Sequence, residues 1–146
     1  MDLTLGARLK ELPGPIMVTG HTGFKGTWLT LLLEQLGVDI IGVSLPAEMN
    51  SLYERMNRFG KIPEVFIDVR DVNALSVFLE NSQPSAIIHL AAQPLVLESY
   101  IQPRETFETN VMGTVNLLNC AFSVSSIKSI IVATTDKVYR NENLGK

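Results

Sequence analysis

A glycine-rich turn near the start of the chain has the residue types and the spacing of a phosphate-binding site. In the stretch VTGHTGFKGTWL (residues 18–29), Gly20, Gly23 and Gly26 recur every third residue between an apolar run and a leucine-rich run. If a strand precedes this turn and a helix follows it, backbone N–H groups gather at the helix N-terminus, which is an anion-binding position. Gly20 then allows the tight turn, Gly23 the close approach of a pyrophosphate, and Gly26 close packing of the helix on the sheet.

The spacing of these glycines separates the turn from two other phosphate motifs. It is G-x-x-G-x-x-G, whereas the common dinucleotide fingerprint is G-x-G-x-x-G. The order Lys25-Gly26-Thr27 also differs from the Gly-Lys-Ser/Thr order of a P-loop. Three glycines alone are also consistent with a tight turn that holds no ligand. The dinucleotide interpretation therefore depends on the elements that surround the turn.

Those elements are short apolar runs that alternate with segments of helical length. We predict strands at 15–20, 38–44, 64–68, 85–92 and 128–135, and helices at 23–37, 51–59, 71–84 and 103–122. Near-continuous apolar strands are typical of a parallel sheet with helices on both faces. The sequence therefore predicts one α/β domain over 1–146, of the Rossmann type, with strand order 3-2-1-4-5.

Composition narrows the class of protein further. The 146 residues are about one domain, and a hydrophobic content of 46% is enough for a sizeable core. A net charge of −3 argues against a protein that coats nucleic acid. No apolar run approaches the roughly 18 residues of a membrane span, and the first residues do not form a signal peptide. The single cysteine, Cys120, favours a reducing compartment, so we expect a cytoplasmic protein with no membrane partner and no metal site.

Several stretches of the chain resemble the extended short-chain dehydrogenase/reductase family, which includes the NAD-dependent epimerases and dehydratases of nucleotide sugars. They are VTGHTGFKGTWL, DVRD, HLAAQPLV, SY, ETNVMGTVNLL and TTDKVY, and the resemblance covers residues 15 to about 140. Within the family, GHTGFKG, AAQPLV and DKVY are most similar to the CDP-glucose 4,6-dehydratase branch. Members of that branch are lyases of deoxysugar biosynthesis.

The resemblance implies an NAD site at the carboxyl ends of the strands, where ligands bind in open α/β sheets. The glycine turn would hold the pyrophosphate, Asp68 and Val69 would meet the adenine, and the residues after the fourth strand would line the ribose and nicotinamide. The implied cofactor-binding residues are Gly20, Thr22, Gly23, Phe24, Lys25, Gly26, Ser44, Asp68, Val69, Leu90, Ala91, Ala92, Gln93 and Thr134. The implied substrate-binding residues are Ser99, Tyr100 and Asn110.

The resemblance places the catalytic residues at Thr135, the end of the predicted fifth strand, and at Asp136 and Lys137, which follow it directly. A 4,6-dehydratase removes a hydride from C4 of the sugar, eliminates water across C5 and C6, and returns the hydride to C6. The elimination needs a base for the C5 proton and an acid for the leaving hydroxyl. By resemblance Lys137 is the base, Asp136 is the acid, and Thr135 lies beside the C4 hydroxyl. Related dTDP-glucose enzymes carry Asp-Glu at the acid–base pair, so Lys137 favours the CDP-sugar branch.

Some of these residues also have an ordinary structural interpretation. Asp68 is placed to complement the dipole of the following helix. Asp136 and Lys137 are also interpretable as a solvated loop pair. His89 is interpreted as a packed strand histidine, and Tyr100 as a packing or substrate-rim residue without a catalytic role.

The chain also departs from the family pattern in three places. The Tyr-x-x-x-Lys pair that the family uses for oxidation is missing from 1–146, as are the later strands and the sugar-binding region. We therefore expect the sequence to be the N-terminal half of such an enzyme, and to be inactive alone. Ser44 stands where an acidic residue would bind the adenosine ribose, so either NAD or NADP is possible as the cofactor. Leu97 and Glu98 replace expected basic residues, which puts diphosphate contacts from that loop in doubt.

Two alternatives to a CDP-glucose 4,6-dehydratase stay open. One is another nucleotide-sugar epimerase or dehydratase of the same family, and the other is a dinucleotide-binding module without catalysis.

Helix 103–122 is apolar on more than one side, which bears on assembly. One face carries Phe107, Val111, Val115 and Phe122, and other sides carry Met112, Leu117 and Cys120. One face should pack on the sheet. The other is expected to pair with a second copy, since the resemblance implies a homodimer through this helix.

Overall fold

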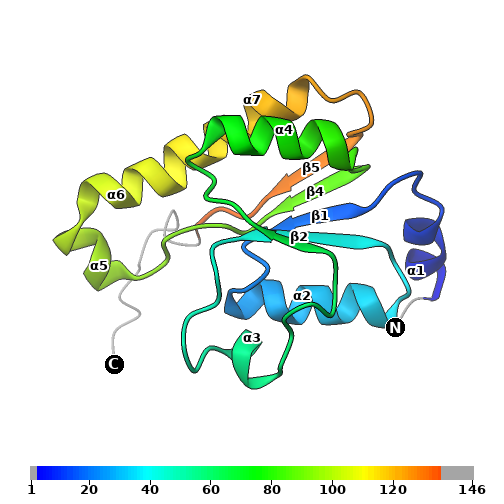
Figure 1. The fold of residues 1–146 in the computed structure, drawn as a ribbon, viewed down its shortest axis with the longest axis horizontal. Coiled ribbons are helices and arrows are strands. Elements are labelled where there is room, and N and C mark those ends of the chain that lie inside the picture. Colours follow the sequence, from blue (N-terminus) through cyan, green and yellow to red (C-terminus); the bar gives the residue numbers. More distant parts are fainter. Residues whose placement is uncertain (1–2, 136–146) are drawn as a thin grey trace, which may run out of the picture.

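A computed structural model describes residues 3–135 of the chain, which form a sheet between two layers of helices (Figure 1). Five parallel strands are hydrogen-bonded in the order β3-β2-β1-β4-β5. They are β1 (Ile16–Thr19), β2 (Ile40–Ser44), β3 (Glu64–Phe66), β4 (Ala86–His89) and β5 (Ser129–Val132). The predicted strand order is confirmed, and β1, which leads into the glycine turn, is the central strand.

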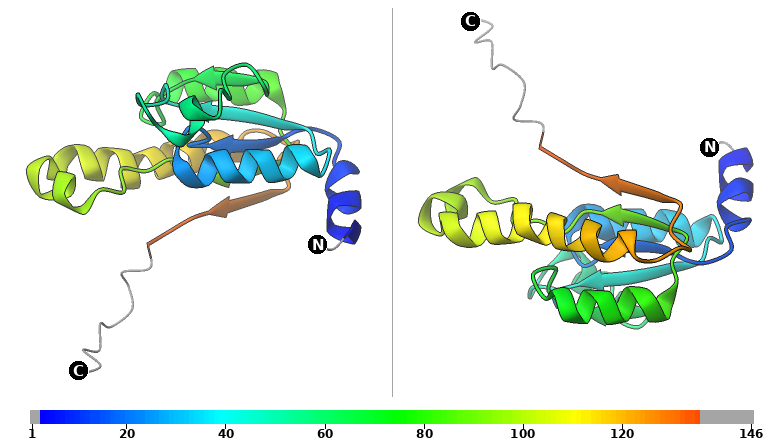
Figure 2. Two further views of the ribbon diagram at one scale, coloured as in Figure 1. Left: turned by 90° about the horizontal axis from the view of Figure 1, so that it is seen from below. Right: turned by 90° about the horizontal axis from the view of Figure 1, so that it is seen from above.

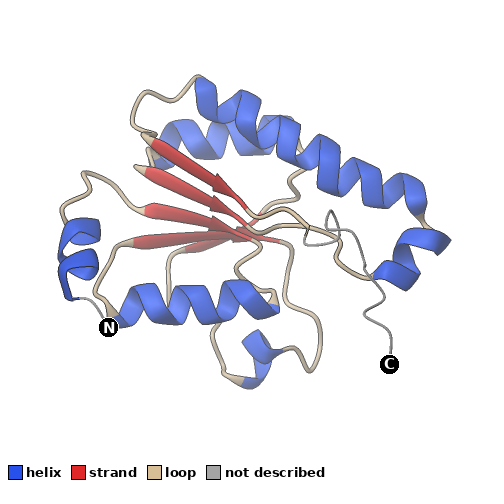
Figure 3. Ribbon diagram, turned by 180° about the vertical axis from the view of Figure 1, so that it is seen from behind, coloured by secondary structure: helices blue, strands red, loops and turns tan. Residues whose placement is uncertain are grey.

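The helices lie on both faces of this sheet, as predicted. They are α1 (Leu3–Lys10), α2 (Phe24–Gln35), α3 (Leu52–Arg55), α4 (Val72–Ser82), α5 (Val96–Ile101), α6 (Pro103–Phe107) and α7 (Gly113–Phe122). Helix α2 covers one face, and α4 with α7 covers the other (Figure 3). The predicted helix 103–122 runs from α6 to α7 through five residues of π-helix, Glu108–Met112. Figure 2 shows α5 and α6 reaching beyond the carboxyl ends of the strands.

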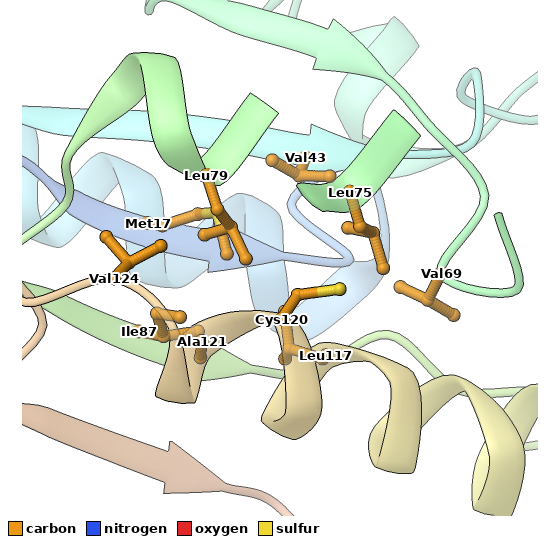
Figure 4. Close-up of a cluster of buried hydrophobic side chains, with 10 residues drawn as sticks. All are labelled: Met17, Val43, Val69, Leu75, Leu79, Ile87, Leu117, Cys120, Ala121 and Val124. Atoms are coloured by element: carbon orange, nitrogen blue, oxygen red, sulfur yellow. The ribbon is translucent and has the colours of Figure 1, made fainter. Parts of the chain in front are cut away.

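Two hydrophobic clusters explain why the strands are apolar throughout. Met17 packs with Leu75, Leu79 and Leu117 between the sheet and helices α4 and α7 (Figure 4). Its neighbours in β1, Ile16 and Val18, belong to a second cluster that includes Leu33 of α2. Because successive side chains of a strand point to opposite faces, a strand covered on both faces needs apolar residues at every position.

Two helices, α1 and α5, were not predicted from the sequence. Both are short, with eight and six residues, and α5 buries no residue. Its apolar side chains at Leu97, Tyr100 and Ile101 are exposed. These three residues have helical spacing, but six residues are far fewer than the roughly 11–18 over which apolar periodicity identifies a helix.

Helix α7 packs on the core through one leucine and three small residues. The buried positions of α7 are Gly113, Leu117, Cys120 and Ala121. A Cβ added to Gly113 would lie 2.6 Å from Cγ2 of Val69, so glycine is needed for this close approach. The face with Phe107, Val111, Val115 and Phe122 is exposed.

Candidate functional site

The turn between β1 and α2 demands glycine at two of its three glycine positions, whatever it binds. Gly20 has φ +70°, and a Cβ added to it would lie 2.7 Å from the backbone nitrogen of Ala91. A Cβ on Gly26 would collide with the backbone of Gly20 and would lie 2.6 Å from Cα of His21. These two glycines therefore let the turn fit between the strand ends and let α2 begin close to it.

Gly23 differs, because any residue can adopt its φ and an added Cβ would make only one tight contact. It caps α2 with φ −73°, and the nearest atom to an added Cβ is the carbonyl oxygen of Gly20, at 3.3 Å. The residue is exposed, as are Phe24 and Lys25 that follow it. The first amides of a helix have no partner within the helix, and its dipole favours an anion at this end. Gly23 therefore leaves space where a phosphate group can approach the backbone.

Thr22 joins the turn to the end of β2. Its hydroxyl lies 2.7 Å from the hydroxyl of Ser44 and 3.0 Å from the carbonyl oxygen of Leu45. Ser44 ends β2 and is buried. The structure thus brings to the glycine turn Ser44, whose own side chain has no carboxylate to bind a ribose hydroxyl.

A buried polar cluster that the sequence analysis did not single out supports the other side of the turn. His21 Nε2 lies 2.9 Å from Glu64 Oε2, and the hydroxyl of Tyr53 donates to the same oxygen at 2.7 Å. Burial and Glu64 raise the pKa of Tyr53. Burial opposes ionisation of Glu64, but hydrogen bonds from Gly60, Tyr53 and His21 lower its pKa. No motif links residues so far apart in the chain, so only the fold reveals them.

Asp68 follows β3 and is held by Arg70. Its carboxylate accepts hydrogen bonds from Nη2 of Arg70 at 2.7 Å and from the backbone N–H of Arg70 at 2.8 Å. Arg70 also pairs with Glu105 of α6, at 3.3 Å. Hydrogen bonds from Arg70 lower the pKa of Asp68, although partial burial opposes the shift. Asp71, and not Asp68, caps α4, by accepting a hydrogen bond from the N–H of Ala74.

The segment after β4 is held from two sides. The backbone N–H groups of Leu90 and Ala91 both donate to Oγ1 of Thr19, each at 3.2 Å. Gln93 donates its N–H to Oδ1 of Asn110 at 2.7 Å, and Nδ2 of Asn110 donates to the carbonyl oxygen of Gln93 at 3.0 Å. Asn110 lies in the π-helical turn. Its side chain thus positions Gln93, a role that the sequence analysis did not foresee for this predicted substrate residue.

The other predicted substrate and catalytic residues that the structure describes lie on α5 and after β5. Ser99 and Tyr100 lie on α5, and Tyr100 is 81% exposed, which contradicts its interpretation as a packing residue. Thr134 and Thr135 follow β5 and are exposed. Asp136 and Lys137 lie outside the described residues.

His89 is packed as expected, at the end of β4, with 2% of its surface exposed. Its two ring nitrogens lie 2.6 Å from Thr19 Oγ1 and 3.0 Å from Thr114 Oγ1. Burial lowers the pKa of this imidazole because it disfavours the charged form.

This lowered pKa predicts an acid-sensitive fold. The unfolded chain binds the proton at a pKa of about 6.5, and the folded chain only at a lower pH. Stability should therefore stay constant with respect to His89 above about pH 6.5 and fall as the pH drops below it. Urea unfolding across this range measures the slope. His89→Gln should be less stable than wild type near neutral pH but should lose this part of the slope. An identical slope in both proteins would contradict the prediction.

Among residues 3–135, no three metal-ligating side chains gather into a cluster. None of the helices described there is long and apolar enough to cross a membrane.

Comparison with known sequences agrees with this geometry. The family model described as GDP-mannose 4,6 dehydratase matches residues 17–143. The chain is 45% identical over 128 residues to CDP-glucose 4,6-dehydratase of Salmonella typhimurium, an alignment that covers 86% of the chain and 35% of that enzyme. It is 31% identical over 127 residues to CDP-paratose 2-epimerase of Salmonella typhi, covering 85% of the chain and 37% of the relative. The chain thus spans little more than a third of these relatives.

Solved structures show the same fold. UDP-glucose-4-epimerase from Stenotrophomonas maltophila, with bound NAD and formylated UDP-arabinopyranose, matches with a TM-score of 0.73 and 26% identity. The match covers 89% of this chain and 39% of that one. The Rossmann-type fold and the resemblance to nucleotide-sugar epimerases and dehydratases are confirmed. The chain belongs to the GDP-mannose 4,6 dehydratase family, within the short-chain dehydrogenase/reductases.

Proposed function

We propose that this chain is the NAD-binding part of a 4,6-dehydratase that converts CDP-glucose to CDP-4-keto-6-deoxyglucose. The observation that supports it most is the space at Gly23, where an added Cβ would have only the carbonyl oxygen of Gly20 within 4 Å. A glycine at a position with ordinary φ and one tight contact is accounted for by a ligand that approaches the backbone. The 45% identity to a CDP-glucose 4,6-dehydratase supports the choice of sugar.

The residues at the carboxyl edge of the sheet fit a dinucleotide. The N-terminus of α2 would hold the pyrophosphate, with contacts from Thr22, Phe24 and Lys25 of the turn. Asp68 and Val69 would border the adenine, and the segment Leu90–Gln93, with Thr134, would border the nicotinamide ribose. When bound, NAD would accept a hydride from the sugar and later return it. NADP stays an alternative, because Ser44 offers no carboxylate to repel a 2′-phosphate.

Three consecutive residues after β5 would carry the sugar chemistry. Thr135 would orient the C4 hydroxyl, Lys137 would take the C5 proton, and Asp136 would protonate the departing C6 hydroxyl. A lysine acts as a base only when neutral, which burial or a nearby positive charge promotes. Ser99 and Tyr100 of α5 would contact the nucleotide sugar. The Tyr-x-x-x-Lys pair for oxidation is not within 1–146, so activity would require the complete protein.

A nucleotide-sugar epimerase is the second candidate function. It is favoured by the epimerase with bound NAD that shares the fold, and by the 31% identity to CDP-paratose 2-epimerase. An epimerase changes configuration at one carbon without loss of water, and has no need for the acid–base pair at Asp136 and Lys137.

Product analysis separates the two functions. The complete protein would be incubated with NAD and, in separate reactions, with CDP-glucose, UDP-glucose and GDP-mannose. A dehydratase product is lighter than its substrate by one water and carries a 4-keto group, whereas an epimerised product has an unchanged mass. We expect water loss with CDP-glucose and much slower turnover of the other two sugars. An isomer of unchanged mass would overturn the proposal in favour of an epimerase.

We also expect a homodimer in the cytoplasm. The exposed face formed by Phe107, Val111, Val115 and Phe122 would pair with the same face of a second copy. Cys120 is buried and forms no disulfide, which fits a reducing compartment.

Charge placed on this face should dissociate the dimer. Val111→Lys would bury an unpaired charge and should raise the dimer dissociation constant about a hundredfold or more. Val77→Lys is the matched control, because Val77 is exposed on α4, outside the proposed interface. Sedimentation velocity over a concentration series measures both. A Val111→Lys protein as dimeric as the control would count against this interface.

A further inference from the structure

A buried chain of hydrogen bonds crosses the carboxyl edge of the sheet, and the proposed function leaves its central residue, His89, without a role. Oγ1 of Thr19 lies 2.6 Å from Nδ1 of His89, and Nε2 of His89 lies 3.0 Å from Oγ1 of Thr114. The Thr114 hydroxyl continues to the carbonyl oxygen of Asn110 at 2.8 Å. The imidazole thus joins the ends of β1 and β4 to the start of α7.

The donors and acceptors of this chain are consistent with a single arrangement of protons. Thr114 donates its hydroxyl proton to Asn110, so its oxygen is an acceptor for His89. Nε2 of His89 then carries the ring proton, and Nδ1 is an acceptor. The Thr19 hydroxyl donates to Nδ1, and its oxygen accepts the N–H groups of Leu90 and Ala91. A proton on Nδ1 would reverse the Thr19 bond, so that Nδ1 would compete with the amides of Leu90 and Ala91 for Oγ1 of Thr19. Burial, which lowers the pKa of His89, opposes a second ring proton.

The backbone that Thr19 holds lies against the glycine turn. A Cβ on Gly20 would come within 2.7 Å of the nitrogen and 2.9 Å of Cα of Ala91, so turn and segment touch through their main chains. A shift of the Thr19 hydroxyl would release the amide of Ala91, whereas the amide of Leu90 would keep its bond to the carbonyl oxygen of Thr19, at 3.2 Å. Because Ala91 is the residue that touches Gly20, its release would change the spacing between the segment and the turn.

We propose that His89 is a positioning residue, which in its Nε2–H tautomer holds the Thr19 hydroxyl and thereby sets the distance between the Leu90–Ala91 backbone and the glycine turn. This inference rests on the proposed function, because cofactor affinity is what that distance controls. The Thr114 side of the ring anchors the imidazole, and the Thr19 side acts on the site.

Two variants test the two ring nitrogens of His89 separately, because each keeps the hydrogen bond of only one of them. The side-chain amide of His89→Asn reaches the place of Nδ1 and can still accept from Thr19. The amide of His89→Gln reaches the place of Nε2 and keeps only the bond to Thr114. We expect the Gln variant of the complete protein to bind NAD about tenfold more weakly than the Asn variant, as for the loss of one hydrogen bond. Titration calorimetry measures both.

The outcomes distinguish this inference from the proposed function. If wild type does not bind NAD, the proposed function fails. If wild type binds NAD but the two variants bind equally, the positioning role is overturned, because a purely structural histidine would not discriminate between its two nitrogens.

Two further measurements apply if a His89 variant does not fold. Thr19→Ser keeps the hydroxyl and should bind NAD about tenfold more tightly than Thr19→Val, which removes it. In wild type, ¹⁵N chemical shifts of the histidine ring should show His89 protonated at Nε2 alone at neutral pH. Equal binding by the Thr19 pair, or a proton on Nδ1, would overturn the proposal.

Discussion

Replacing Gly23 by valine is expected to abolish measurable NAD binding while the domain stays folded. The valine side chain would occupy the space over the N-terminus of α2, where the pyrophosphate is proposed to lie. We expect the dissociation constant to rise about a hundredfold or more, equivalent to about 2.8 kcal/mol. Calorimetric titration with NAD measures the affinity, and circular dichroism with thermal unfolding checks the fold. The backbone should tolerate the change, because Gly23 has φ −73° and only one atom within 4 Å of an added Cβ.

Gly26→Ala is the matched control, three residues away in the same turn. Its Cβ would collide with the backbone of Gly20 and His21, so it should destabilise the fold itself, by about 1–3 kcal/mol. The two substitutions should thus have different effects: Gly23→Val should abolish NAD binding, and Gly26→Ala should lower the stability of the fold. A Gly23→Val protein that binds NAD with wild-type affinity would contradict the site.

Removal of the Lys137 side chain should stop the reaction after the cofactor has been reduced. Lys137→Ala would leave hydride transfer possible but remove the base for the C5 proton, so NADH should accumulate in a single turnover. Formation of the product should slow by about 10²–10⁴-fold, because the elimination loses its base. Asp136→Asn should behave similarly, because both residues serve the elimination. Thr135→Val should instead slow the appearance of NADH. Rapid-mixing absorbance with CDP-glucose follows each step.

Lys128→Ala is a suitable control for this experiment. Lys128 is exposed and precedes β5, at the opposite end of the strand from the proposed catalytic residues. Turnover by Lys137→Ala at the rate of this control would make Lys137 a solvated loop charge. The assignment to the CDP-glucose branch would then lose its main chemical support.

The strands and the glycine turn were predictable from the sequence because each depends on local patterns, and the strand order then followed from the topology of the Rossmann-type fold. Ile16, Met17 and Val18 form an unbroken apolar run because β1 is covered on both faces. Gly20 is required by its φ of +70°, and Gly26 by its contact with Gly20 and His21 of the same turn. An apolar run and a glycine spacing can both be recognised in a short stretch of sequence.

The partners of the polar side chains were not predictable, because they come from distant segments. His21 pairs with Glu64, and Asn110 with Gln93, across 43 and 17 residues that no shared motif connects. Helix 103–122 posed a different problem, since it is apolar on more than one side. The face that packs on the core is the one with Gly113, because this glycine lets α7 approach Val69 closely. Hydrophobic periodicity measures apolar character and does not detect such a close approach.

The fate of the C4 hydrogen tests the proposed reaction most directly. CDP-glucose carrying deuterium at C4 would be incubated with the complete protein and NAD, and the product analysed by nuclear magnetic resonance and mass spectrometry. A 4,6-dehydratase takes this hydrogen as hydride and returns it to C6. The account predicts a 4-keto product, lighter by one water, with deuterium at C6 and no net formation of NADH. A product that keeps all its oxygen atoms and carries the deuterium at C4 would contradict it.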